Sequence, residues 1–135
     1  MSPIPVICGI IVKEGKVLAA QRSETMSLPL KWEFPGGKLL VGESYEDCLQ
    51  RELLEELNIS VVIKAQLTTH VHDYGSLVIA LTPFLATYAG GEITLHEHQQ
   101  VGWYSKDEMK ALDWAPADIP ILYEFLERFS TEDQP

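Results

Sequence analysis

A short segment dense in glutamate constrains this chain more than any other. From Gly37 to Ile59 the sequence is GKLLVGESYEDCLQRELLEELNI. Within it, Glu52, Glu55 and Glu56 follow the i, i+3, i+4 spacing that places side chains on one face of a helix. An apolar stripe runs beside them every fourth residue, at Leu49, Leu53 and Leu57. The pattern predicts an amphipathic helix over 44–57, preceded by a loop over 36–42 and packed on a core by its leucines.

The carboxylates on that face need a positive partner. Two like charges ~4 Å apart repel by ~1 kcal/mol in water and by ~4 kcal/mol at an effective dielectric near 20. Arg51 is the cation nearest to them, and Glu55 lies at its i+4 position. A hard divalent cation with oxygen ligands, Mg²⁺ or Mn²⁺, would relieve the repulsion. Taken alone, the pattern is more typical of a solvated acidic helix face.

The spacing around the glutamates resembles a family signature. The pattern G-x5-E-x7-R-E-apolar-x-E-E-x-x-apolar is met by Gly37, Glu43, Arg51, Glu52, Leu53, Glu55, Glu56 and Ile59. It resembles the Nudix box, which marks hydrolases of nucleoside diphosphates linked to another group. The family usually has glycine where this chain has Asn58. Asparagine is the next most tolerant residue in the left-handed conformation that often follows a helix, so we expect the box to keep its structure.

The resemblance implies a metal site and catalytic roles. It implies Mg²⁺, with Mn²⁺ as a substitute, bound by Glu52, Glu55, Glu56, the carbonyl group of Gly37 and, from a later loop, Glu97. Glu52 is the first candidate for the general base and Glu97 the second, with an ordinary loop charge as the alternative for Glu97. Arg51 is expected to fork to Glu43 and hold the loop against the helix, so that losing either residue costs activity through geometry.

Substrate contacts are predicted before the box and near the end of the chain. Arg22 and Lys38 flank the predicted metal loop and are the best candidates for phosphate binding, although each could be an ordinary surface charge; Lys31 and Lys106 have weaker claims. Leu30 and Phe34 are candidates for the wall of a base pocket, with a pure core role as the alternative for Phe34.

Asp118 is the polar candidate for recognition of the base, and its alternative role is that of a helix N-cap. An ionised aspartate only accepts hydrogen bonds. It would therefore favour cytosine, through its N4 amine, or guanine, through its N1 and N2 hydrogens. Thymine would present its O4 atom, an acceptor, to another acceptor.

Length and charge limit the function classes. The 135 residues fit one domain over 1–135. A net charge of −10 disfavours binding to a nucleic acid polymer but not to one nucleotide held through a metal. No apolar run is long enough for a bilayer, and the first residues lack the charged region of a signal peptide, so we expect a cytoplasmic protein with no membrane partner. A monomer and a homodimer both remain open.

The cysteines and histidines give only weak evidence for a metal site. Cys8 and Cys48 are far apart in sequence, and we expect two small buried groups rather than a disulfide or a metal site. His70 with His72 and His96 with His98 have zinc-compatible spacing, but nothing in the sequence brings the two pairs together.

The remaining periodicity predicts an α+β protein. Strands are expected over 5–13, 16–21, 61–74, 76–88, 92–95 and 101–104, an extended segment over 32–35, and helices over 105–112 and 120–129. The resemblance implies the Nudix fold, a mixed β-sheet sandwiched between helices (α/β/α). Through WEFPGGK and the HEHQ and WAPADIPIL segments, the chain resembles the MutT-like branch and, within it, the CTP pyrophosphohydrolases.

These features together predict an enzyme. We expect a Mg²⁺-dependent nucleoside triphosphate pyrophosphohydrolase that acts on cytosine nucleotides or their modified forms and releases the monophosphate and pyrophosphate. One alternative is a diphosphatase that removes oxidised guanine nucleotides such as 8-oxo-dGTP. Another is a nucleotide-binding module without catalysis.

Overall fold

Two long strands form the centre of one mixed sheet in the computed structural model, which describes residues 2–129. Strand β1 (Ile4–Lys13) runs parallel to β7 (Val78–Gly90), and the other pairs of named strands are antiparallel. The remaining elements are β2 (Lys16–Gln21), β3 (Trp32–Glu33), β4 (Gly36–Lys38), α1 (Tyr45–Leu57), β5 (Ser60–Gln66), β6 (His70–Asp73), β8 (Gln100–Tyr104), α2 (Lys106–Lys110), the 3₁₀ helix η1 (Pro116–Asp118) and α3 (Ile119–Arg128).

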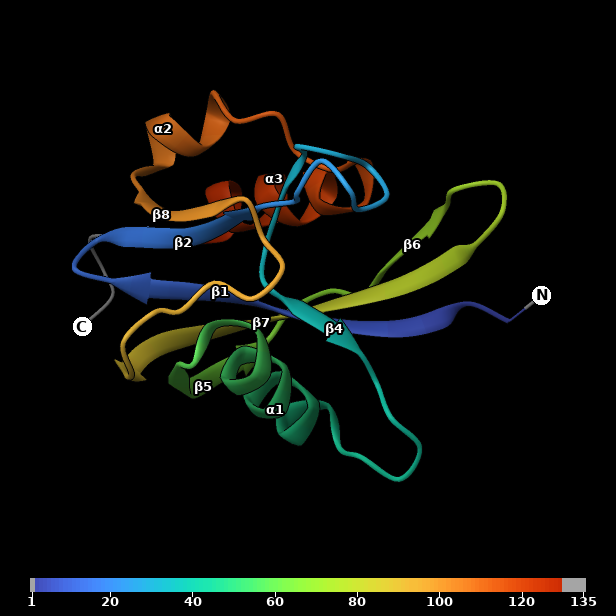
Figure 1. The fold of residues 1–135 in the computed structure, drawn as a ribbon, viewed down its shortest axis with the longest axis horizontal. Helices are drawn as coiled ribbons and strands as arrows, with labels where there is room; N and C mark the ends of the chain where they lie inside the picture. The colour runs from blue at the N-terminus through green and yellow to red at the C-terminus, as the bar shows by residue number, and fades with distance from the viewer. Residues whose placement is uncertain (1, 130–135) are drawn as a thin grey trace.

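Helices cover both faces of the sheet, as predicted. Figure 1 shows α1 on one side of the sheet and α2 and α3 on the other. Strand β1 serves both layers: Ile7 and Ile11 pack with the leucines of α1, whereas Ile10 and Val12 pack with α3. A central strand that is buried on both faces is an unbroken apolar run rather than an alternating one, which explains the sequence PVICGIIV.

Strands β1 and β2 separate soon after their hairpin. They pair only at Val12 with Val17 and at Lys13 with Lys16. Further along, β1 pairs with β4 over residues 6–8, and β2 pairs with β3 through Ala20 and Glu33. The segment 32–38 therefore crosses from one strand to the other, and it lies where the sheet has opened (Figure 1).

Helix α1 forms as predicted. The hydroxyl group of Ser44 accepts from the N–H of Asp47 at 3.0 Å and caps the helix start. Asn58 ends the helix in the left-handed conformation at φ 60°, and its side-chain amide donates to the carbonyl group of Glu92. Asparagine thus takes the conformation that usually requires glycine and adds a bond to the segment that follows β7.

Two strand predictions were wrong. Residues 92–95 form no strand, because this segment crosses the end of α1, where the N–H of Thr94 donates to Leu57. The predicted strand 61–74 is divided into β5 and β6. The division lies where both pass Pro83 of β7, which has no N–H to donate, and where Thr68 turns to bond Glu124 of α3. In addition, Gly36–Lys38, predicted as loop, is strand β4.

Gly36 should be indispensable for the fold. A Cβ atom at this position would lie 1.9 Å from the carbonyl oxygen of Ile7 and 2.6 Å from the Cα atom of Cys8. Backbone atoms of a central strand cannot move aside, so Gly36→Ala should lower the free energy of unfolding by about 3 kcal/mol or prevent folding. Urea denaturation would measure this effect.

Gly9→Ala is the matched control. A Cβ atom at Gly9 meets only side-chain carbons, at 3.3 Å and beyond. This variant should unfold close to wild type. Equal losses in the two variants would show that the β1–β4 contact is not what requires glycine.

Candidate active site

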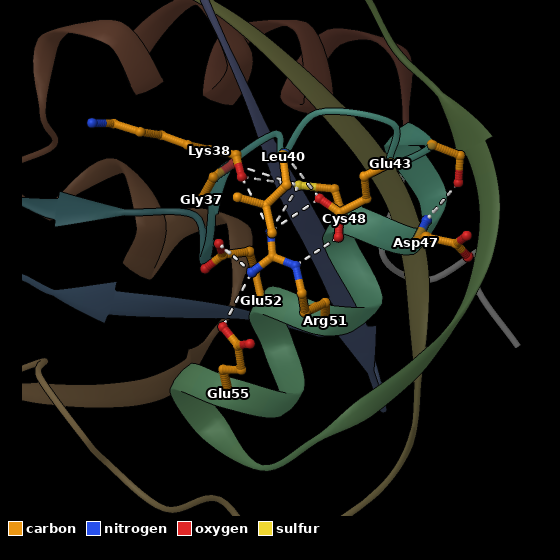
Figure 2. Close-up of polar contacts among 10 residues, drawn as sticks. Gly37, Lys38, Leu40, Glu43, Asp47, Cys48, Arg51, Glu52 and Glu55 are labelled. Atoms are coloured by element: carbon orange, nitrogen blue, oxygen red, sulfur yellow. Dashed lines mark hydrogen bonds and ion pairs between the residues drawn. The ribbon is translucent and has the colours of Figure 1, made fainter.

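The guanidinium group of Arg51 organises the acidic helix (Figure 2). Its Nε and Nη2 atoms donate to the two oxygens of Glu43 at 2.6 and 3.0 Å. Its Nη1 atom donates to Glu52 at 2.9 Å and to Glu55 at 3.1 Å. The predicted fork between Arg51 and Glu43 is therefore present, and one cation compensates carboxylates from the loop and from two positions of the helix.

Gly37 lies directly against Glu52. A Cβ atom at Gly37 would come within 2.3 Å of the carboxyl carbon of Glu52. The Glu52 side chain is only 12% exposed, and one of its oxygens is held by Arg51. The absence of a side chain at Gly37 thus lets the helix carboxylate lie on the backbone of β4.

A cavity of about 580 Å³ opens beside this helix, between the separated strands. Its charged end is lined by Gly37, Lys38, Glu56, Glu97 and His98. Burial raises the pKa of Glu56, and the nearby Glu97 and Glu52 carboxylates raise it further, while His98 lowers it. Glu56 therefore lies close to a second carboxylate, that of Glu97, at this end of the cavity.

The donor set suits a hard cation, although no preassembled site is present. Within residues 2–129, no three side chains of the types His, Cys, Asp and Glu converge as metal ligands. Glu52 and Glu55 contact Arg51, whereas Glu56 and Glu97 line the cavity. All four offer carboxylate oxygens, which Mg²⁺ and Mn²⁺ prefer, and a dication would offset both the burial of Glu56 and its repulsion by Glu97, which raise the pKa of Glu56. The predicted ligands therefore fit such an ion, and their assignment stays a prediction.

A series of polar contacts that was not predicted from the sequence crosses the cavity wall. Arg22 donates to one oxygen of Glu33 at 2.8 Å, and the other oxygen lies 2.8 Å from Nε2 of His98. Arg22 also donates to the backbone and side chain of Ser27. Its guanidinium group therefore holds a carboxylate and a loop with three of its five N–H donors, and phosphate binding by Arg22, which stays a prediction, would use the other two.

Lys38 is the better placed of the two predicted phosphate cations. It lines the cavity, it is exposed, and it forms no ion pair within the part of the chain that the structure describes. Lys31 instead pairs with Asp113 at 2.8 Å, and Lys106 donates to the carbonyl group of Phe129. Neither of these two lines the cavity.

The other end of the cavity is apolar. Phe34 lines it and also packs on Trp114, with ring centroids 4.6 Å apart, so its core and wall roles coincide. Leu30 does not line the cavity; its side chain points elsewhere and is 41% exposed, and Leu28 contributes to the wall instead. Both leucines have positive φ angles in a tight loop, and sequence periodicity does not report which side chain such a loop turns inward.

Asp118 is buried in the wall of the apolar end. It makes no side-chain cap bond to α3, and its Oδ2 atom instead accepts from the N–H of Phe34 at 2.9 Å. Burial raises its pKa well above the usual range, and the Glu33 carboxylate raises it further. Both cysteines are buried, as predicted: Cys8 lines the same cavity, and Cys48 lies on the buried face of α1.

Comparison with known proteins identifies the family. The NUDIX domain model matches residues 2–125. The chain belongs to the Nudix family. It is 36% identical over 126 residues to the CTP pyrophosphohydrolase of Escherichia coli K12, covering 93% of each chain. It is also 36% identical over 117 residues to the putative 8-oxo-dGTP diphosphatase 2 of Mycobacterium tuberculosis, covering 84% of this chain and 81% of the relative.

The fold agrees with that of a solved structure. The solution structure of the E. coli ORF135 protein superimposes with a TM-score of 0.84 at 34% identity, covering 100% of this chain and 96% of the other. The family match and the named relatives show a Nudix hydrolase, and the superposition shows that it has the mixed sheet and helical layers of this fold. In residues 2–129, no helix is both long enough and apolar enough to cross a membrane.

Gly37→Ala should lower activity strongly while leaving the fold largely intact. The added methyl group meets a side chain rather than backbone, so Glu52 would have to leave its place against β4. A displaced charged group at a reaction centre costs about 100-fold in rate. We expect kcat to fall by about that factor while the melting temperature changes little. A variant with wild-type kcat would show that this position of Glu52 is irrelevant.

The ion pair between Glu43 and Arg51 should have a defined pH dependence. The hydrogen bond from Arg51 lowers the pKa of Glu43 from 4.5 to about 2. A folded-state pKa below the unfolded value stabilises the protein above pH 4.5, and this stabilisation is lost as the pH falls toward about 2. Glu43→Gln should therefore unfold more easily than wild type at pH 7, and the difference should shrink at pH 3.

Glu46→Gln, an exposed position on the same helix, should show neither effect. Chemical denaturation at the two pH values would measure both variants. A wild-type advantage over Glu43→Gln that is equal at pH 7 and pH 3 would contradict the assignment of the pKa shift.

Proposed function

We propose that this protein is a divalent-cation-dependent nucleoside triphosphate pyrophosphohydrolase that prefers cytosine nucleotides or their modified forms. It would release the nucleoside monophosphate and pyrophosphate. The observation that carries the proposal is one cavity that is lined both by Glu56 of the box, with Glu97 and Lys38, and by the buried Asp118 next to Phe34. A triphosphate and a base need these two environments at opposite ends of one site. The relative named CTP pyrophosphohydrolase supports the same choice.

The charged end would bind the phosphates. Glu52, Glu55, Glu56, Glu97 and the carbonyl group of Gly37 would hold Mg²⁺ or Mn²⁺. When bound, such an ion neutralises phosphate charge and lowers the pKa of a coordinated water. Lys38 would add a positive charge at the same end of the cavity.

Two residues compete for the role of general base. Glu52 has one oxygen held by Arg51 and the other without a donor in residues 2–129, so that oxygen is oriented and free to take a proton. Glu97 lies in the exposed loop before β8 and also lines the cavity. The fixed position of Glu52 favours it, because general bases act at hydrogen-bond distance.

The apolar end would bind the base. Phe34 supplies a flat wall, and Asp118 accepts hydrogen bonds when it is ionised. Cytosine offers its N4 amine to such an acceptor, whereas thymine offers the O4 acceptor. The preference for cytosine over thymine follows from this difference.

A second substrate class is favoured by the environment of Asp118. Burial and Glu33 raise its pKa, so the neutral acid forms more readily than at an exposed aspartate. The neutral acid can also donate, for example to a carbonyl oxygen of guanine. Oxidised guanine nucleotides are therefore the second candidate, and a relative named as a putative 8-oxo-dGTP diphosphatase supports it.

A substrate panel tests the proposal. Purified protein would be incubated with Mg²⁺ and one nucleotide at a time: dCTP, CTP, 5-methyl-dCTP, 8-oxo-dGTP or dTTP. The rate of pyrophosphate release would be measured for each. We expect kcat/KM for dCTP to exceed that for dTTP. The reverse order would reject the assigned role of Asp118, and nucleotide binding without turnover across the panel would indicate a binding module.

Glu56→Gln tests the metal end separately. Loss of one carboxylate that faces the cavity should lower Mg²⁺-dependent turnover by about 100-fold. Glu46→Gln removes the same charge from the exposed start of α1 and should keep wild-type rates. Wild-type rates in Glu56→Gln would overturn the metal assignment.

A further inference from the structure

Tyr74 belongs to the cavity wall but to none of the roles described so far. It follows β6 in the hairpin that joins β6 to β7, and it lines the cavity. Its N–H donates to the carbonyl group of Leu77 at 2.8 Å, which fixes the hairpin turn. Its ring packs against His72, with centroids 4.3 Å apart, and against the core beneath α3. The position of the phenol group is therefore set from both its backbone and its ring.

The hydroxyl group of Tyr74 has one filled and one open hydrogen-bonding direction. Its oxygen accepts from the N–H of Ala117 at 3.0 Å. Within residues 2–129, no acceptor takes its proton. Burial raises the pKa of this phenol, which keeps it a donor at neutral pH. An oriented donor on a cavity wall that has no protein acceptor is available to a ligand.

The hydroxyl group of Tyr74 is held next to Asp118 in the cavity wall. Ala117, which holds the Tyr74 oxygen, immediately precedes Asp118, and both residues are buried. Asp118 has its Oδ2 atom occupied by the N–H of Phe34, which leaves Oδ1 for a ligand. One patch of the wall thus presents a donor and an acceptor.

We propose that Tyr74 is a specificity-determining residue whose hydroxyl group donates to a carbonyl oxygen or ring nitrogen of the bound base, next to the contact made by Asp118. The proposal rests on the proposed function, because it assumes that a base occupies the apolar end. Cytosine has the complementary pattern, since its N4 amine lies beside the N3 acceptor.

A bracing role is the rival explanation. The bond from Ala117 to Tyr74 also ties η1 to the β6–β7 hairpin, so Tyr74 could act only by keeping Asp118 in place. The two roles differ in a double-mutant experiment. A brace that acts through Asp118 has no effect once the Asp118 carboxylate is removed, whereas a direct donor keeps its effect.

The experiment compares wild type, Tyr74→Phe, Asp118→Asn and the double variant. KM and kcat for dCTP with Mg²⁺ and the affinity for dCMP by calorimetry would be measured. Loss of one neutral hydrogen bond should raise KM and weaken dCMP binding by about 5-fold, with kcat nearly unchanged. Relative to Asp118→Asn, the double variant should show a further rise in KM and a further loss of dCMP affinity by the same factor. Tyr123→Phe removes a hydroxyl group from the exposed face of α3 and should match wild type.

Two results would overturn the proposal. One is Tyr74→Phe with wild-type KM and dCMP affinity. The other is a loss that vanishes in the Asp118→Asn background, which would establish the brace. Because dCMP binding needs no turnover, it still tests Tyr74 if wild type hydrolyses nothing, so the two proposals fail separately.

Discussion

The bidentate ion pair between Arg51 and Glu43 is the contact on which the rest of the site depends. It ties the loop before α1 to the middle of that helix, and the same guanidinium group holds Glu52 and Glu55. Without it, Glu43, Glu52 and Glu55 would lose the cation that all three contact. The low pKa of Glu43 reflects the strength of this contact. Because Arg51 compensates only part of the negative charge, the cavity end near Glu56 stays electronegative and suits a dication.

The separation of β1 from β2 creates the room for a substrate. Segment 32–38 bridges the two strands, and it delivers Phe34 to the apolar end and Gly37 to the charged end. Two glycines permit this close crossing: Gly36 lies against the backbone of β1, and Gly37 lies against Glu52. One short segment therefore determines the positions of both the base wall and the metal loop.

The sequence predicted what depends on local spacing. Helix α1, its Ser44 cap, the left-handed Asn58 and the fork of Arg51 all follow from residues close together in the chain. The two wrong strand predictions, 61–74 and 92–95, lie where a tertiary contact determines the backbone conformation. These contacts are at Pro83 of β7 and at the end of α1. The wall residues Glu33, His98 and Tyr74 were missed for the same reason. Their partners are distant in sequence, and no periodicity reports which loop faces a cavity.

Binding of Mn²⁺ to the nucleotide-free protein, measured by electron paramagnetic resonance, tests the central claim most directly. The claim is that the carboxylates of Glu52, Glu55, Glu56 and Glu97 together bind Mg²⁺ or Mn²⁺. Wild type should bind Mn²⁺ saturably, Mg²⁺ should displace it, and Glu52→Gln should bind it at least about 10-fold more weakly. Equal Mn²⁺ affinity in wild type and Glu52→Gln would contradict the claim.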